Sequence, residues 1–220
     1  KENIVATLSK GSERFAGGVI AAANHVADFC SEIEVITTLG TIDSYDELVN
    51  DSVRANVKLT VLPCPDIPTT KKTRFVEMAY MRKLFEVYSF DDTPLNDELQ
   101  SQLNEIISQK AADFDLVIIT DFGHGMIAKP TIDVLTEKAR FLCVNSQTNA
   151  GNQGFNLITK YKQADYVCID GGEARLAVAD KYSDLAVIAG DLLPSQLDCS
   201  KIIVTGGVVG CFTFDANTKT

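Results

Sequence analysis

The stretch Val204–Asp215, VTGGVVGCFTFD, places a glycine-dense turn between two apolar runs. Glycine has no Cβ, so a turn of this kind can bring main-chain N–H groups close to a bound group. The turn fits the pattern T-x-G-x-x-G with Thr205, Gly207 and Gly210, whose N–H groups and hydroxyl suit phosphate oxygens. A tight hairpin between KIIVT and CFTFD would use the same glycines, so the pattern alone leaves both interpretations open.

Helices and apolar strands alternate before this turn. A helix is predicted at NDELQSQLNEIISQKAA. It precedes four predicted strands, FDLVIITDF, FLCVNSQ, ADYVCID and KIIVTGG, which are separated by helices or polar loops. One of these connections, NAGNQGFNLITKYKQ, is expected to be a loop and a helix. Alternation of this kind predicts a parallel sheet with helices on both faces. NIVATLS is expected to be a strand, and segments near 1–15 and 57–90 are expected to form a small β flap.

Composition limits the partners that this chain can have. Its 220 residues, 45% apolar and 23% charged, are ordinary for a globular protein. The net charge of −10 argues against nonspecific binding to nucleic acid or to anionic membranes, and no apolar run is long enough to span a bilayer. We therefore expect a cytoplasmic protein whose partner is a small molecule.

Six cysteines are scattered without a CxxC pair, mostly inside apolar runs, which predicts buried free thiols in a reducing compartment. The two histidines, His25 and His124, lie far from any cysteine pair, so the sequence gives no support for a Cys/His metal site. His124, between two glycines in DFGHGM, is either a turn residue or part of the ligand cleft.

Polar residues follow four of the predicted strands. In an open parallel sheet, ligands bind at the carboxyl ends of the strands, so these residues are expected to share one site. Each could instead be a turn or helix-capping residue. They are Asp121, Asn145, Asp170, Glu173 and the segment Thr205–Gly210.

Two further motifs lie in the first half of the chain. Gly17 and Gly18 stand where an extended segment becomes an Ala-rich helix, whose N-terminus could bind polar oxygens or simply pack closely on a sheet. In TKKTR, Lys72 and Arg74 share one face of a strand and could clamp a phosphorylated molecule. The alternative is a solvated strand edge protected by charge.

Taken in order, these motifs resemble the ribokinase-like (PfkB) carbohydrate kinases, and among them the kinase domain of ADP-heptose synthase. Residues 11–40 are similar to that family's first signature, a double glycine, an Ala-rich helix and a strand ending in glycine. The resemblance continues over nearly the whole chain, through TTKKTRFVE, KLFEVYSFDD, DLVIITDFGHGMI, DYVCIDGGEARLA (where the family has Asn-x-x-Glu) and VTGGVVG. It implies a three-layer α/β/α fold with a mostly parallel central sheet and a small β flap.

The resemblance also implies a function. A kinase of this family would transfer a phosphoryl group from ATP to a hydroxyl of a sugar phosphate such as heptose 7-phosphate. By resemblance, Thr205, Gly207 and Gly210 would face the ATP phosphates, and Asp170 and Glu173 would act through Mg²⁺ and its waters, with Glu173 as the metal residue. Gly17 and Gly18 would line the sugar site, Lys72 and Arg74 would lie near a substrate phosphate, and Asp121 would help to shape the cleft.

The sequence departs from the family pattern at several positions. Ala21 and Ala22 stand where an Asn is usual, Asp170 replaces the Asn of Asn-x-x-Glu, and Asn145-Ser146-Gln147 replaces Asp-Pro-Lys. The family's first strand would precede Lys1, and its G-A-G-D motif with the catalytic Asp would follow Thr220. We therefore expect residues 1–220 to be one kinase domain, incomplete at both ends, with negligible turnover by itself.

Two alternatives stay open. The chain could be a non-catalytic nucleotide- or sugar-binding module of the same fold, because of the substitutions at Ala21, Asn145 and Asp170. It could also act on another sugar or a nucleoside. The resemblance further suggests a homodimer formed through the flap.

Overall fold

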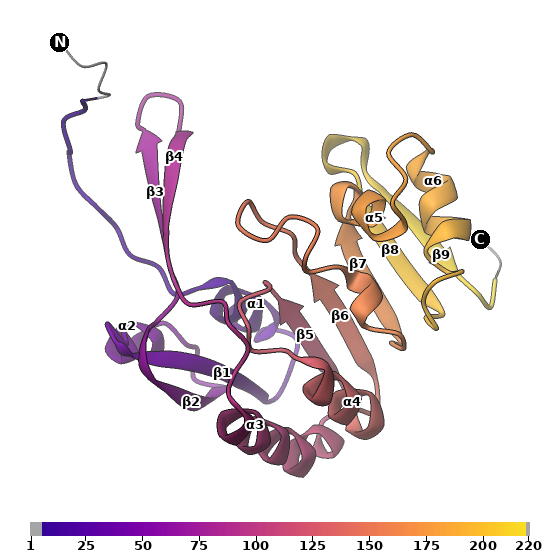
Figure 1. Ribbon diagram of the computed structural model, residues 1–220, viewed down its shortest axis with the longest axis horizontal. Helices are drawn as coiled ribbons and strands as arrows, with labels where there is room; N and C mark the ends of the chain where they lie inside the picture. Colours follow the sequence, from indigo (N-terminus) through magenta and orange to yellow (C-terminus); the bar gives the residue numbers. More distant parts are fainter. Residues whose placement is uncertain (1–5, 219–220) are drawn as a thin grey trace. The chain divides into compact units, whose positions relative to one another are not determined.

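The computed structural model describes residues 6–218, which divide into two compact units. Unit 1 takes the residues up to 37 and 45–60, and unit 2 takes 38–44 and the residues from 61 on. Figure 1 follows the elements of both units along the chain.

Unit 1 is built around a short helix, α1 (Gly18–Val26), that begins at the double glycine. A second helix, α2 (Asp46–Asp51), lies between the strands β1 (Ile33–Ile42) and β2 (Val57–Pro68), which pair with each other and run on into unit 2. Asn24 joins the two helices, because its side-chain amide donates to the carbonyl of Ser52 (2.6 Å) and its oxygen accepts from the N–H of Arg54 (3.0 Å).

Unit 2 contains a hairpin and a five-stranded sheet. The hairpin is β3 (Lys71–Glu77) and β4 (Arg82–Ser89). The sheet has the order β5-β6-β7-β8-β9; its first four strands are parallel and β9 is antiparallel to β8. The strands are β5 (Val117–Asp121), β6 (Leu142–Ser146), β7 (Tyr166–Asp170), β8 (Lys201–Thr205) and β9 (Cys211–Asp215). The α-helices are α3 (Asp97–Lys110), α4 (Lys129–Lys138), α5 (Gly171–Val178) and α6 (Leu185–Val187), and the single turns are η1 (Ala111–Asp113), η2 (Ile158–Lys160), η3 (Ile188–Leu192) and η4 (Gly207–Val209).

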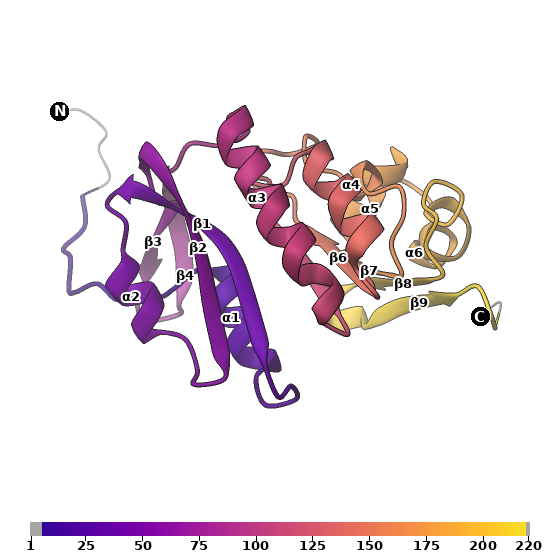
Figure 2. The same ribbon diagram turned by 90° about the horizontal axis from the view of Figure 1, so that it is seen from below.

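The two faces of this sheet have different surroundings. Helices α3 to α6 lie on one side of it (Figure 2), and the residues on that side, such as Val144, Val167 and Ile202, are almost fully buried. On the other face Cys143 and Cys168 are half-buried, and Ile118 keeps 49% of its surface exposed.

Three local predictions were wrong within the described residues. Residues 6–9 of the predicted strand NIVATLS form no strand, and the rest of that segment lies outside the described residues. Likewise 6–15, expected as part of a flap, is irregular and exposed. In the segment 149–163 only η2 forms a helical turn. Within it the N–H groups of Asn149 and Gly151 donate to the side-chain oxygens of Asn152 and Asn149, and such local bonds compete with helical hydrogen bonds.

Candidate active site at the carboxyl ends of the strands

The ends of β7 and β8 bring two predicted site residues together. Asp170 and Thr205 are direct partners in the parallel ladder, so both lie at the carboxyl edge of the sheet, and both are exposed. Asp170 is also the N-cap of α5, where its Oδ1 accepts from the N–H of Glu173 (2.8 Å). Asp170 therefore caps a helix and lies at the predicted ligand edge at the same time.

Glu173 is buried and has main-chain partners for both carboxylate oxygens. Oε2 accepts from the N–H of Asp170 (2.9 Å), which completes a capping box, and Oε1 accepts from the N–H of Thr148 (2.9 Å). Burial raises the pKa of this carboxyl, against the lowering effect of the two N–H donors. Each oxygen accepts one hydrogen bond and keeps a second lone pair, and the role of Glu173 as a metal residue stays a prediction.

The glycine turn between β8 and β9 is ordered by its own main-chain hydrogen bonds. Gly206 donates to the carbonyl of Gly210 (2.7 Å), and Gly210 donates to that of Gly207 (3.1 Å). Gly207 and Gly210 have φ of +61° and +98°, and a Cβ at either would meet no atom within 4 Å. The turn is thus a hairpin connection, as one interpretation predicted, and it is also open to a ligand.

The carboxylate of Asp121 is held inside the protein. It accepts from the hydroxyl of Tyr161 (2.7 Å) and the N–H of Gly123 (2.9 Å), and it forms an ion pair with Lys160. Asp121 is only 4% exposed. Its contacts order the loop that follows β5, so its predicted role in shaping the cleft would be indirect.

A second loop fixes this first one. Asn149 and Asn152 each donate to the carbonyl of Phe122 (3.1 Å), and Asn156 donates to that of Asp121 (3.1 Å). This contribution was not found from the sequence, although the density of Asn in NSQTNAGNQGFN was a signal that its side chains bind main-chain groups.

The hairpin presents a charged face as predicted, but the two cations have different partners. Lys72 lies opposite Tyr88, and Arg74 lies opposite Glu86. Arg74 donates to Glu86 (2.7 Å), which also accepts from Tyr88 and Lys83, and these hydrogen bonds hold the pKa of Glu86 at about 2. Lys72 instead lies over the ring of Tyr88, with Nζ 5.1 Å from its centre, and no ion pair is found for it within residues 6–218.

A series of rings links Lys72 to His124. The rings of Tyr88 and Phe90 lie 5.9 Å apart, and those of Phe90 and His124 lie 4.6 Å apart. The Nδ1 atom of His124 is buried and has no hydrogen-bond partner among the residues that the structure describes. This places His124 against the base of the hairpin, an arrangement that the sequence alone did not reveal.

Burial lowers the pKa of His124, and the charge of Lys72 lowers it further, while Asp92 and Asp121 act in the opposite direction. Below the ordinary pKa of histidine, about 6.5, the unfolded chain gains this proton before the folded one. The unchanged chain should therefore lose stability relative to His124→Gln as the pH falls from about 7 to about 5. Urea unfolding at several pH values checks this, with the exposed His25→Gln as control. Parallel curves for the two variants would contradict the prediction.

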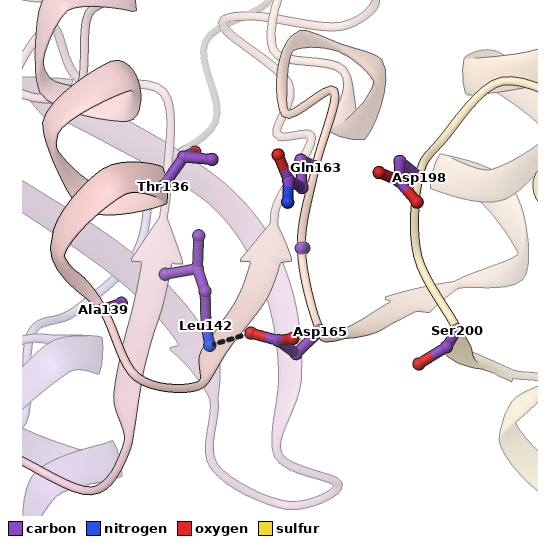
Figure 3. A pocket seen from close by; sticks show the side chains of 8 residues that line it. Thr136, Ala139, Leu142, Gln163, Asp165, Asp198 and Ser200 are labelled. Atoms are coloured by element: carbon purple, nitrogen blue, oxygen red, sulfur yellow. Dashed lines mark hydrogen bonds between the residues drawn. The ribbon is translucent and has the colours of Figure 1, made fainter.

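Two cavities lie at opposite ends of the sheet. One of about 140 Å³ is lined at the amino ends of β6 to β8 by Leu142, Asp165, Asp198 and Ser200, with Asp165 accepting from the N–H of Leu142 (Figure 3). The other, about 230 Å³, lies at the carboxyl end beside Gly123, Gly125 and Lys160. The second cavity follows β5 at the carboxyl edge of the sheet, but none of the predicted site residues lines it.

The remaining predicted residues are placed as follows. Gly17 is the N-cap of α1 and Gly18 is its first residue, in unit 1, and their part in a sugar site stays a prediction.

All six cysteines are free, but the prediction that they are buried was only partly right, because Cys30 and Cys211 are exposed. Asn145 donates to the carbonyl of Cys168 (2.8 Å) and so has a structural partner.

In the part of the chain that the structure describes, no group of three or more His, Cys, Asp or Glu side chains is arranged to hold a metal ion. Mg²⁺ in kinases is commonly held by one or two carboxylates together with substrate phosphates and water, so the role of Glu173 toward Mg²⁺ stays a prediction. No helix within residues 6–218 is long and apolar enough to cross a membrane.

Solved structures match the chain over most of its length. Phosphofructokinase-2 from Escherichia coli in complex with fructose-6-phosphate aligns with a TM-score of 0.69 at 16% identity, over 96% of this chain and 71% of that one. A pyrophosphate-dependent kinase in the ribokinase family, complexed with a pyrophosphate analog and myo-inositol, aligns with a TM-score of 0.60 at 21% identity, over 91% and 68%. The fold is ribokinase-like.

Sequence relatives agree with this ribokinase-like fold. The bifunctional protein HldE of Bradyrhizobium diazoefficiens is 25% identical over 210 residues, 92% of this chain, and that of Rhodopseudomonas palustris is 24% identical over 201 residues. The chain spans about two fifths of the length of these relatives, 41% and 40%. No family model matches the chain. The resemblance drawn from the motifs is confirmed.

Proposed function

We propose that this chain forms most of the kinase domain of a longer protein that transfers a phosphoryl group from ATP to a hydroxyl of a sugar phosphate, with heptose 7-phosphate as the first candidate. The observation that carries the proposal is the placement of Asp170, Thr205 and the open Gly207–Gly210 turn side by side at the carboxyl edge of a ribokinase-like sheet. The resemblance of the motifs to the kinase domain of ADP-heptose synthase, and the match to phosphofructokinase-2 in complex with fructose-6-phosphate, support a sugar-phosphate substrate.

The roles of the residues follow from their positions. The open turn and the hydroxyl of Thr205 would bind the phosphate oxygens of ATP, since glycine there allows close approach of the main chain. That hydroxyl has only a long hydrogen bond of 3.5 Å, to the carbonyl of Ile169, and can turn toward a ligand. Mg²⁺, when it enters with the nucleotide, would neutralise phosphate charge.

The donor site is tested with Thr205→Val, which keeps the shape of the side chain but removes its hydroxyl. We expect about tenfold weaker ATP binding, the usual effect of losing one hydrogen bond to a charged group. Isothermal titration of the longer protein measures this. Thr213→Val is the matched control, because Thr213 is exposed on β9, away from the turn. Equal affinity in the two variants would remove Thr205 from the site.

The reaction is tested by ADP release from the longer protein with a panel of sugar phosphates and free sugars. We expect turnover with one or more sugar phosphates, and negligible turnover from residues 1–220 alone. ATP binding without turnover on any member of the panel would favour the non-catalytic module instead.

A further inference from the structure

We propose that His124, together with Lys72, binds the phosphate group that the substrate already carries. This inference rests on the proposed function, because it assigns a substrate contact to that site. It gives His124, for which the sequence left a turn or a place in the ligand cleft open, a specific ligand, and it gives Lys72 a different partner from the expected Arg74.

The first argument is the charge balance of the hairpin. The guanidinium of Arg74 is 2.7 Å from Glu86, so its charge is already offset. Lys72 is half-buried and lies over the Tyr88 ring, with no ion pair among the described residues. The carboxylate of Glu86, which is ion-paired with Arg74, also attracts Lys72 without forming an ion pair with it among the described residues, so a further anion could bind to Lys72.

The second argument is the state of His124. A buried polar atom without a hydrogen bond is unfavourable by about 1–3 kcal/mol and is rare in native proteins unless a ligand or water supplies the partner. Nδ1 of His124 is such an atom. The Phe90 ring lies against the imidazole at 4.6 Å, so we expect this end of the hairpin to shift when a ligand enters.

The third argument is that these groups form one continuous surface. Lys72, Tyr88, Phe90 and His124 follow one another at ring distances of 5.1, 5.9 and 4.6 Å. The loop at Gly151 lies beside this surface, because a Cβ there would be 3.7 Å from Phe90 and 3.9 Å from Tyr88. Lys72 and His124 lie at the two ends of this surface, so a phosphate group that lies over it would be attracted by both basic side chains.

Protonation of His124 should be linked to anion binding. The groups that act on His124 are Lys72 on β3, Asp92 after β4 and Asp121 at the end of β5, and Asp121 is itself paired with Lys160. A bound anion favours the imidazolium, so it raises the pKa of His124. Because the complex with the anion then binds more protons than the free chain does, the affinity of the chain for the anion rises as the pH falls.

The test uses sulfate, which keeps its double charge over this pH range, whereas phosphate gains a proton near pH 6. Each of the two histidines of the sequence gives its own imidazole signal in a proton NMR titration, and His25→Gln assigns them. We expect sulfate to raise the pKa of His124, to leave the His25 signal unmoved, and to bind about tenfold more tightly at about pH 5.5 than at about pH 8.

Two variants identify the partners. Lys72→Met should raise the pKa of His124 without sulfate, because a neighbouring positive charge is lost, and should reduce the effect of sulfate. Lys83→Met is the control on the same hairpin, since Lys83 is exposed. The inference is overturned if sulfate leaves the pKa of His124 unchanged, or if Lys72→Met and His124→Gln bind sulfate as well as the unchanged chain does. The assay needs neither nucleotide nor turnover, so it can succeed or fail independently of the kinase activity.

Discussion

A chain with Gly125→Ala is expected to lose about 3 kcal/mol of its free energy of unfolding, because the new methyl group overlaps the main chain of a neighbouring segment. A Cβ at Gly125 would lie 2.8 Å from the carbonyl carbon of Thr93 and even closer to its oxygen. A flexible side chain could move aside, but Thr93 is part of the connection between β4 and α3. The loop that carries His124 would have to shift instead.

Gly154→Ala is the matched control for this variant. Gly154 and Gly125 have similar positive φ values, +84° and +79°, so alanine has nearly the same backbone strain at both. A Cβ at Gly154, however, would meet no atom within 4 Å. We expect a loss of about 1 kcal/mol there, from the strain alone. Urea unfolding measures both, and equal losses would show that close packing at Gly125 is not the cause.

Asp121→Ala is expected to lose about 4 kcal/mol, because it leaves a partly buried cation and a buried hydroxyl without their shared partner. The side chain of Lys160 is 29% exposed and that of Asp121 is 4% exposed. Tyr161 donates to the same carboxylate, and burial, with the charge of Asp121, raises the pKa of this phenol. Removing the carboxylate therefore breaks the ordering of the loop after β5 as well as the ion pair.

The control for Asp121 is an ion pair of the same type on the surface. Lys129 and Asp133 are 2.7 Å apart on α4, and their side chains are 82% and 61% exposed. Asp133→Ala should change the free energy of unfolding by no more than about 0.5 kcal/mol. Urea unfolding of both variants measures the difference, and a loss for Asp121→Ala as small as that for Asp133→Ala would show that burial adds nothing.

The edge of the sheet that carries the candidate site could be predicted from the sequence, because ligands bind at the carboxyl ends of the strands in open parallel sheets. Apolar runs identified β5 to β8, and the rule placed Asp170 beside Thr205 at one edge, as the ladder confirms. The glycine turn was predicted for the same reason. The local sequence was enough to place Asp170 and Thr205, because each lies at the end of its own apolar run.

The partners of the site residues could not be predicted, because they depend on contacts between distant segments. Asn152 reaches a carbonyl that lies 30 residues earlier, and Tyr161 reaches a carboxylate 40 residues earlier. The separation of Lys72 from Arg74 depends on the hairpin register, which sets Glu86 opposite Arg74. A register shifted by two residues would place Glu86 opposite Lys72 instead, and nothing in TTKKTRFVE determines which register forms.

The unequal faces of the five-stranded sheet have a consequence for how the chain can vary. Val144 is 2% exposed under the helices, whereas its neighbour Cys143 points to the half-buried side. A polar replacement at Val144 would be placed in the dry interior, but the same replacement at Cys143 would keep contact with water. Polar substitutions should therefore be tolerated at every second position of β6 and β7. In a library of random variants, the folded members should carry such substitutions at alternate positions along each strand.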